Sequence, residues 1–241
     1  MSFLRRPTWF AVALTVAGVL AFVRLGVWQL DRANEKEDLL RRYATAAAAG
    51  VETFGDIPES PPVDRYPRLE LHGRYVPGHA YLLDDQSHGG QVGVQVYVPF
   101  APRKSDRLVL VGLGFLPKEA GANPHLPPLP TGDTVLRGLY VPPPGVGVRL
   151  GGDRLPEQRG AEKTMVYVDL KEIGVDLGRV LYPRVLLLDA DPGALYARDW
   201  TPAVMPPARH RAYAFQWFTF AIAAVVIFLV LHRKRRPPTD R

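Results

Sequence analysis

The sequence predicts an α+β fold in which an N-terminal and a C-terminal transmembrane helix flank a β-rich periplasmic domain with one short helix. Three observations predict this arrangement. Two long apolar runs lie near the ends of the 241-residue chain. Between them, short runs of β composition alternate with turns rich in Pro and Gly. Basic residues collect outside both apolar runs, as they do at the cytoplasmic ends of membrane spans.

The first apolar run, residues 8–23, carries no charge. If the Arg24 guanidinium reaches the membrane surface, the span extends over residues 8–30, which is long enough to cross a bilayer. A cleaved signal peptide is the alternative, but no small-x-small site followed by a polar segment ends the run. We therefore predict an uncleaved anchor after a short cytoplasmic N-terminus, residues 1–7.

The second apolar run, residues 212–231, also lacks any charge. We predict a transmembrane helix over residues 210–231, followed by a basic cytoplasmic tail, residues 232–241. The positive-inside rule places both termini in the cytoplasm, because basic residues precede the first span and follow the second. Residues 31–209 then lie on the other side of the membrane, in the periplasm. Because no amphipathic transit peptide is visible, the predicted location is the bacterial inner membrane.

The middle of the chain begins with a helical stem. Residues 31–49 are rich in helix formers and contain the i,i+4 pair Glu37 and Arg41, and residues 51–67 read as a Pro-rich connector. Loops are expected at 117–130 and 142–152, where Pro and Gly are dense, and a short helix at Leu170–Leu177. The predicted strands are Arg68–Tyr75, 80–84, 92–100, 107–115, Thr134–Val141, 164–169 and 184–189.

Composition excludes several classes of function. The chain has no Cys, which removes disulfides, thiolate zinc sites, iron–sulfur clusters, thiol nucleophiles and Cys-based copper carriers. The net charge of +6 resides at the chain ends, because residues 25–209 hold 21 basic and 23 acidic groups. We therefore expect no nucleic-acid partner. No P-loop, GxGxxG, HExxH or GxSxG motif is present, so we predict no enzyme and no catalytic residue.

Candidate chemistry lies at the outer ends of the two spans. Arg24, Trp28 and Arg32 recur every four residues along one face of the first helix. On the second helix His210, Tyr213, Ala214 and Trp217 share one face. If the spans pack together, an imidazole, two guanidinium groups and two indoles meet in one shallow site. The amides of Gln29 and Gln216 need polar partners in lipid, and we expect contacts between the helices.

Two interpretations of this cluster at the outer ends of the spans remain open. Aromatic side chains at a membrane boundary form belts, and cations there reach toward head groups. Alternatively, the cluster is a haem pocket, in which His210 binds the iron, Arg24 or Arg32 neutralises the propionates, and Trp28, Trp217 and Tyr213 lie against the ring. The other five His suit this role less well, because they lie in the predicted soluble domain or on the cytoplasmic side.

The same residues carry a resemblance to a known family. The segment LGVWQL at 25–30, followed by Arg32 and Lys36, resembles the LGxWQLxRxxxK signature of the Surfeit locus protein 1 family. Residues 210–218, HRAYAFQWF, resemble that family's HxxYAxQWF motif at the entry of the second span. Further similar segments at 71–75, 90–93 and 109–117 occur in the expected order. The resemblance thus covers nearly the whole chain.

The resemblance implies a non-catalytic assembly factor for haem–copper cytochrome c oxidase, with two spans around a domain outside the cytoplasm. It implies that haem a is the cofactor, that His210 is its iron ligand, and that the protein aids insertion of haem a into the catalytic subunit. The implied partners are that subunit, the haem a biosynthesis enzyme and membrane lipid. Where the family commonly reads NRGW and LDNR, this chain has GLGF at 112–115 and LDDQ at 83–86. We therefore predict no site in those segments.

Two other functional classes remain. A membrane-anchored scaffold would dock an oxidase subunit through its periplasmic domain without binding haem, and a haem titration separates it from the first class. A periplasmic enzyme is the third class, and it would need a closed pocket lined by titratable groups with strongly shifted pKa values.

Overall fold

The computed structural model describes residues 7–62, 64–118, 124–144, 151–198, 202 and 204–233. The chain divides into two compact units. The helical unit comprises Met1–Arg41 with Ala203–Arg241, and the β unit comprises Arg42–Pro202. As the sequence predicts, the fold is α+β, with a long apolar helix on each side of a β-rich domain along the chain.

The helical unit is a pair of long helices, α1 (Trp9–Ala47) and α3 (Pro207–Leu231). Both are long and apolar enough to cross a membrane. The hydroxyl of Thr8 accepts a hydrogen bond from the Ala11 amide at 3.3 Å and so caps the start of α1. α1 continues without a break into the polar stem, as expected. α3 begins at Pro207, a residue that suits the first position of a helix because it has no N–H to satisfy.

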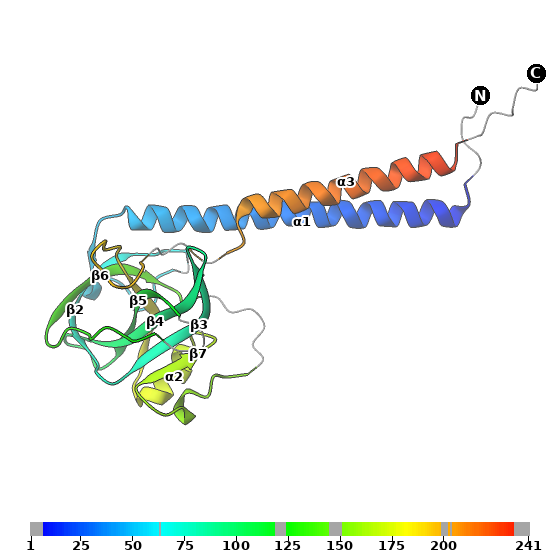
Figure 1. Ribbon diagram of the computed structural model, residues 1–241. Coiled ribbons are helices and arrows are strands. Elements are labelled where there is room, and N and C mark those ends of the chain that lie inside the picture. The colour runs from blue at the N-terminus through cyan, green and yellow to red at the C-terminus, as the bar shows by residue number, and fades with distance from the viewer. Residues whose placement is uncertain are drawn as a thin grey trace, which may run out of the picture. The chain divides into compact units, whose positions relative to one another are not determined.

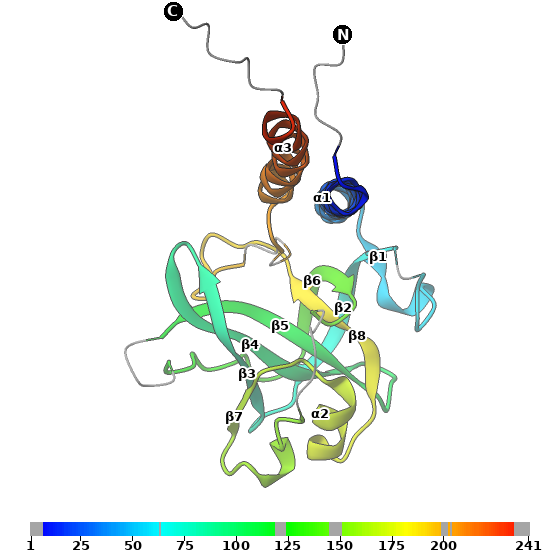
Figure 2. The same cartoon turned by 90° about the vertical axis from the view of Figure 1, so that its right-hand side faces the viewer.

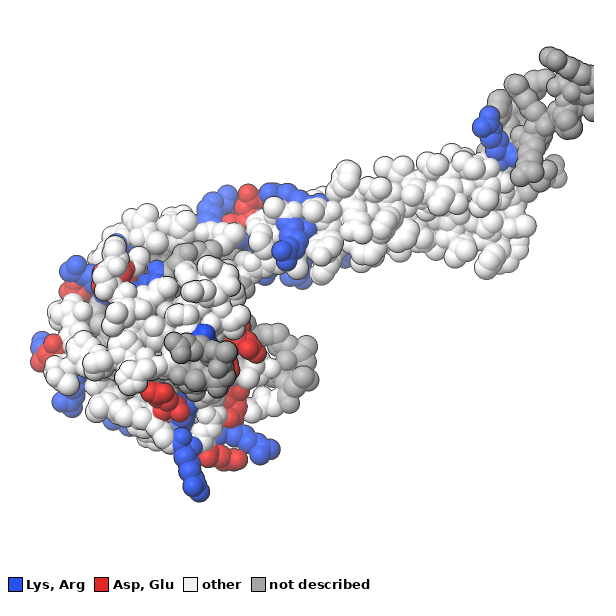
Figure 3. Space-filling model, in the orientation of Figure 1, with Lys and Arg blue, Asp and Glu red and all other residues white. Residues whose placement is uncertain are grey.

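Small residues line the contact between the two helices. α1 and α3 run side by side (Figures 1 and 2). The buried residues of α1 are Gly26 and Ala33, and on α3 Ala214 and Ala221 are buried with the same spacing of seven. Small side chains let two helix backbones approach closely. Most other surface of the pair is uncharged, with charges gathered toward the polar stem and basic atoms near the opposite end (Figure 3).

The β unit is built on a closed ring of strands. Five strands pair in the order β2–β6–β8–β5–β4, and a further pairing of β4 with β2 closes the ring. β3 and then β7 extend from β4, and β1 pairs with β2. The strands are β1 (Glu52–Thr53), β2 (Arg68–Tyr75), β3 (Ala80–His88), β4 (Gln91–Pro102), β5 (Leu108–Pro117), β6 (Thr134–Val141), β7 (Glu162–Met165) and β8 (Leu181–Leu188).

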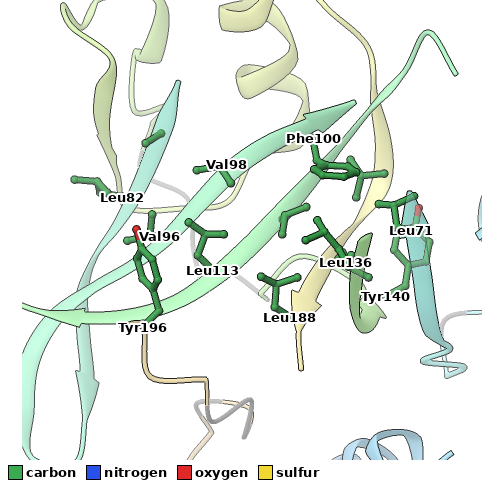
Figure 4. Packing of buried hydrophobic residues seen from close by; sticks show 14 of the residues in the cluster. Leu71, Leu82, Val96, Val98, Phe100, Leu113, Leu136, Tyr140, Leu188 and Tyr196 are labelled. Carbon is green, nitrogen blue, oxygen red and sulfur yellow. The ribbon is translucent and has the colours of Figure 1, made fainter. Parts of the chain in front are cut away.

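Side chains of the ring alternate between two hydrophobic clusters. On β5, Val109 and Val111 belong to the first cluster, and Leu108 and Leu110 to the second. The first gathers residues from all five ring strands and fills the interior (Figure 4). The second contains Ile173 and so packs the outer face of the ring against the short helix. The period of two therefore buries both faces of β4, β5 and β8 over much of their length, whereas alternate side chains of β2, such as His72 and Arg74, stay exposed.

The short helix α2 (Leu170–Leu177) has the predicted bounds. The Asp169 carboxylate accepts a hydrogen bond from the Lys171 amide at 2.9 Å and so caps its start. Gly178 ends the helix in the left-handed conformation, with φ of 59°. Both signals are local, which explains why the sequence suffices to place this element.

Several predicted strand bounds were wrong, for identifiable reasons. β3 does not end at Asp84 but continues through an irregularity between Leu83 and Gln86, where Asp85 adopts φ of 53°. β7 ends at Met165 rather than at 169, because the Asp153 carboxylate accepts the amide hydrogens of the next two residues. The predicted loops at 117–130 and 142–152 lie partly outside the described residues.

A buried guanidinium ties the Pro-rich connector to the ring. Arg184 of β8 is 3% exposed. It donates to the carbonyl of Arg65 at 2.6 Å and to those of Pro61 and Pro62, both at 2.7 Å. A fourth bond reaches the Tyr140 carbonyl at 3.2 Å. Burial lowers the pKa of this guanidinium, but the four carbonyls satisfy its donors and hold the connector in place.

Candidate functional site

The candidate site is centred on His210, in the first turn of α3. This imidazole is 8% exposed. Its Nδ1 lies 2.7 Å from the side-chain oxygen Oε1 of Gln29 on α1. Of the two amides noted in the sequence, Gln29 thus finds a polar partner on the other helix. The carbonyl oxygen of an amide only accepts hydrogen bonds, so Nδ1 is the donor in this contact.

The second ring nitrogen of His210 has a different environment. Nε2 is buried and has no hydrogen-bond partner among the residues that the structure describes. A buried polar atom without a partner is costly and rare in native proteins, and a functional role is one of its explanations. The described residues hold three others, all in the β unit, namely Gln95 Oε1, Arg107 Nε and Tyr196 OH. A neutral imidazole with its proton on Nδ1 holds a free lone pair on Nε2, which is the form that binds metals.

Aromatic packing joins the two helices deeper in the apolar region. The Trp217 ring stacks on that of Phe22, with ring centroids 5.9 Å apart, and Phe220 contacts both rings at 5.8 Å. Trp217 lies on the same face of α3 as His210, as predicted, and its indole packs against α1. These contacts hold the helices together below the imidazole.

Two further contacts fix the alignment of the pair around the imidazole. Gly26 faces the Phe218 ring so closely that an added Cβ would lie 2.6 Å from it. On the polar side, Arg211 forms an ion pair with Glu37. The predicted pairing of Glu37 with Arg41 is wrong, because Arg41 instead pairs with Asp38. The sequence contains a signal for the close approach of the two helices, namely the small residues Gly26 and Ala33, seven positions apart.

The predicted group on the other face of α1 forms a separate arrangement. The Arg32 guanidinium lies over the Trp28 ring, 5.7 Å from its centroid, and forms a 2.7 Å ion pair with Glu35. Trp28 is 42% exposed, and Arg24 is exposed as well. Because successive residues differ by roughly 100° around a helix, Trp28 does not share the direction of Gln29. These contacts lie apart from the His210–Gln29 pair.

Two residues on α3 complete the predicted set. Tyr213 is 42% exposed and flanks the face that carries His210. Gln216 is exposed, roughly 120° around the helix from His210. The structure therefore places the Gln29 amide, and not the Gln216 amide, against a polar partner of the opposite helix.

In the β unit, two segments depart from the family motifs. Residues 112–115 lie within β5, where Leu113 and Phe115 are buried. Asp84 forms an ion pair with Lys118 at 2.6 Å, and this hydrogen-bonded ammonium holds the pKa of the carboxyl below its usual value. No group of three or more metal-ligating His, Asp or Glu side chains occurs among the residues described.

Comparisons with known proteins agree with the motifs at the two helices. A family model described as the SURF1 family matches residues 16–222. Uncharacterized SURF1-like proteins of Mycobacterium tuberculosis and Mycobacterium bovis are each 26% identical over 262 residues, which cover the whole chain and 93% of each relative. A SURF1-like protein of Monosiga brevicollis is 25% identical over 248 residues, 90% of this chain and 88% of that protein. The chain therefore belongs to the SURF1 family, a family associated with cytochrome oxidase assembly.

Proposed function

We propose that this protein is an assembly factor for haem–copper cytochrome c oxidase that binds haem a through His210 and aids its insertion into the catalytic subunit. It does so as a two-pass protein of the bacterial inner membrane, with both termini cytoplasmic and residues 31–209 periplasmic. The observation that carries the proposal is the His210 imidazole, which is buried, bonded through Nδ1 and unpartnered at Nε2 among the described residues.

The imidazole fits the requirements of an iron ligand. A metal-binding His uses the lone pair of one ring nitrogen and donates the other N–H to an oxygen acceptor. His210 provides this arrangement, since Oε1 of Gln29 accepts from Nδ1 at 2.7 Å. Because Nε2 is covered, the covering side chains must move before iron reaches it. Binding therefore includes a local opening at the outer end of the helix pair.

The remaining candidate residues act around the haem rather than on its iron. Trp217 and Tyr213 share the His210 side of α3, and we assign them to contacts with the porphyrin ring, together with Trp28. Arg32 and Arg24 are the cations proposed for the propionates. Since the three residues of α1 lie on another face from Gln29, their contribution is at the edge of the haem and smaller than that of His210.

Assembly rather than catalysis follows from this chemistry. Bound haem a supplies an iron that accepts one imidazole ligand from this chain. A single side-chain ligand on a helix pair that must open to load can also release its cargo, as delivery to the catalytic subunit requires. No proton transfer or bond cleavage is assigned to any residue of the chain.

The haem a content of the oxidase tests the function in cells. A strain that lacks this protein is complemented with the wild type, His210→Ala or the control His232→Ala, a second His near the other end of α3. We expect the wild type and His232→Ala to restore the haem a absorbance of the purified oxidase, and His210→Ala to fail at equal membrane levels. Full restoration by His210→Ala would overturn the haem role in favour of a scaffold that docks the oxidase without haem.

A further inference from the structure

We propose that Gln29 is a positioning residue that fixes the tautomer of His210, with the proton on Nδ1 and the lone pair on Nε2. The consequence for haem rests on the function proposed above. The tautomer itself does not, because it is a property of the protein without ligand. No motif or comparison assigns this role to Gln29, and the contact that carries it joins residues 181 positions apart.

The chemistry of the contact selects one tautomer. A neutral imidazole carries one N–H, on either Nδ1 or Nε2. The 2.7 Å contact faces Nδ1 with a carbonyl oxygen, which has no hydrogen to donate. With the proton on Nδ1, this contact is a hydrogen bond. With the proton on Nε2, a lone pair of Nδ1 would face a lone pair of the Gln29 oxygen, and the N–H of Nε2 would be buried without an acceptor. Both effects favour the Nδ1–H form.

The packing of the helix pair makes the contact short and dry. Gln29 lies between Gly26 and Ala33 along the contact stripe of α1, and both neighbours are fully or nearly fully buried. Their lack of bulk brings the two backbones close enough for a Gln side chain to reach the imidazole. Because the imidazole is 8% exposed, water competes little for Nδ1. The same small residues that pack the helices thus set the orientation of the ring.

The fixed tautomer has a consequence for the proposed ligand. Donation from Nδ1–H to an oxygen raises the basicity of Nε2 and orients the ring toward a metal. Loss of such a partner typically lowers metal affinity by about 10- to 100-fold. Gln29 therefore acts through His210, without touching the iron.

Nitrogen NMR of the haem-free protein tests the tautomer directly. Full-length protein is labelled with ¹⁵N-histidine and purified in detergent, and the His210 signals are assigned by their loss in His210→Ala. We expect one protonated nitrogen, Nδ1, in the wild type. Gln29→Glu, which keeps an oxygen acceptor and adds a negative charge, should also keep the proton on Nδ1. In Gln29→Leu, which removes the acceptor at similar volume, the Nε2–H form should become populated. Gln216→Leu, the same change at an exposed Gln of α3, should leave the signals unchanged.

Two results would overturn the inference. One is a wild-type His210 that carries its proton on Nε2, as it would if the Gln29 amide were turned to present its nitrogen. The other is a Gln29→Leu spectrum that matches the wild type. Both are readable without haem, and circular dichroism of each variant shows that α1 still forms.

Haem binding by the same variants separates this inference from the proposed function. We expect Gln29→Leu to bind haem about 10- to 100-fold more weakly and with a changed midpoint potential, and Gln29→Glu to retain the affinity. If the wild type binds no haem, the proposed function fails while the tautomer result stands. If haem binds through His210 with equal affinity and potential in Gln29→Leu, the positioning role fails while the function stands.

Discussion

Replacing Gly26 by Ala tests the helix packing on which the candidate site depends. A Cβ at this position would lie 2.6 Å from Cε1 and 2.7 Å from Cζ of Phe218. These distances are shorter than van der Waals contact, so the ring or the helices must shift. Overpacking of this kind costs about 1–3 kcal/mol. Ala also gains about 1 kcal/mol over Gly in a helix interior, and this gain has to be separated from the clash.

Gly18→Ala provides the matched control. Gly18 lies in the same helix, and an added Cβ there meets nothing within 4 Å. Both variants share the gain in helix propensity, and Gly26→Ala alone adds the clash. Relative to Gly18→Ala, we therefore expect Gly26→Ala to shift the equilibrium toward separated helices by about 5- to 150-fold, which corresponds to 1–3 kcal/mol.

Thiol labelling measures this equilibrium. The chain has no Cys, so Ala33→Cys introduces a single thiol at a position that is 0% exposed between the helices. A water-soluble maleimide reacts with it in the open state, and the labelling rate reports the opening equilibrium when closing is fast. We expect faster labelling with Gly26→Ala, and no difference between the two variants once Phe218→Ala has removed the ring. Equal rates with Phe218 in place would refute the reasoning.

Three further predictions concern the β unit and the membrane edge. Arg184→Met should lower the free energy of unfolding by about 2–5 kcal/mol, because four carbonyls lose a buried donor; an unchanged melting temperature would contradict this. Because Lys118 lowers the pKa of Asp84, the stability that this pair contributes is complete above about pH 4 and is lost as the pH falls through the folded-state pKa. Asp84→Asn should remove that pH dependence from the stability curve, and an unchanged curve would exclude the pair as its source. Trp28→Ala and Arg32→Ala should each weaken haem binding less than His210→Ala in a titration, and a larger loss would move the site to the outer face of α1.

Local signals account for what the sequence predicts well. Two strands, β2 and β6, and the helix α2 have the predicted bounds, since each is flanked by turn or cap residues that act within a few positions. β3 runs past Asp84, because an irregularity lets a strand absorb a residue with positive φ. The closure of the ring through β2 and β4 joins distant segments, and no local pattern predicts it.

At the candidate site too, local patterns predict some features, and contacts between distant segments decide the rest. Periodicity places Arg24, Trp28 and Arg32 on one face of the first helix, but it does not tell which face meets the second helix. The stripe of Gly26 and Ala33 settles that question, because the backbones approach where side chains are small. The pairing of Gln29 with His210 follows from this choice of face and could not be predicted from either segment alone.

The optical spectrum of the purified protein tests the central claim most directly. Full-length wild type, His210→Ala and His232→Ala are isolated in detergent from cells that make haem a. His232 follows the other end of α3, 22 positions after His210, which makes it a control for the loss of an imidazole far from the candidate site. We predict a Soret band in the wild type and in His232→Ala that is lost in folded His210→Ala. An equal band in His210→Ala, or no band in any folded protein, would contradict haem binding through His210.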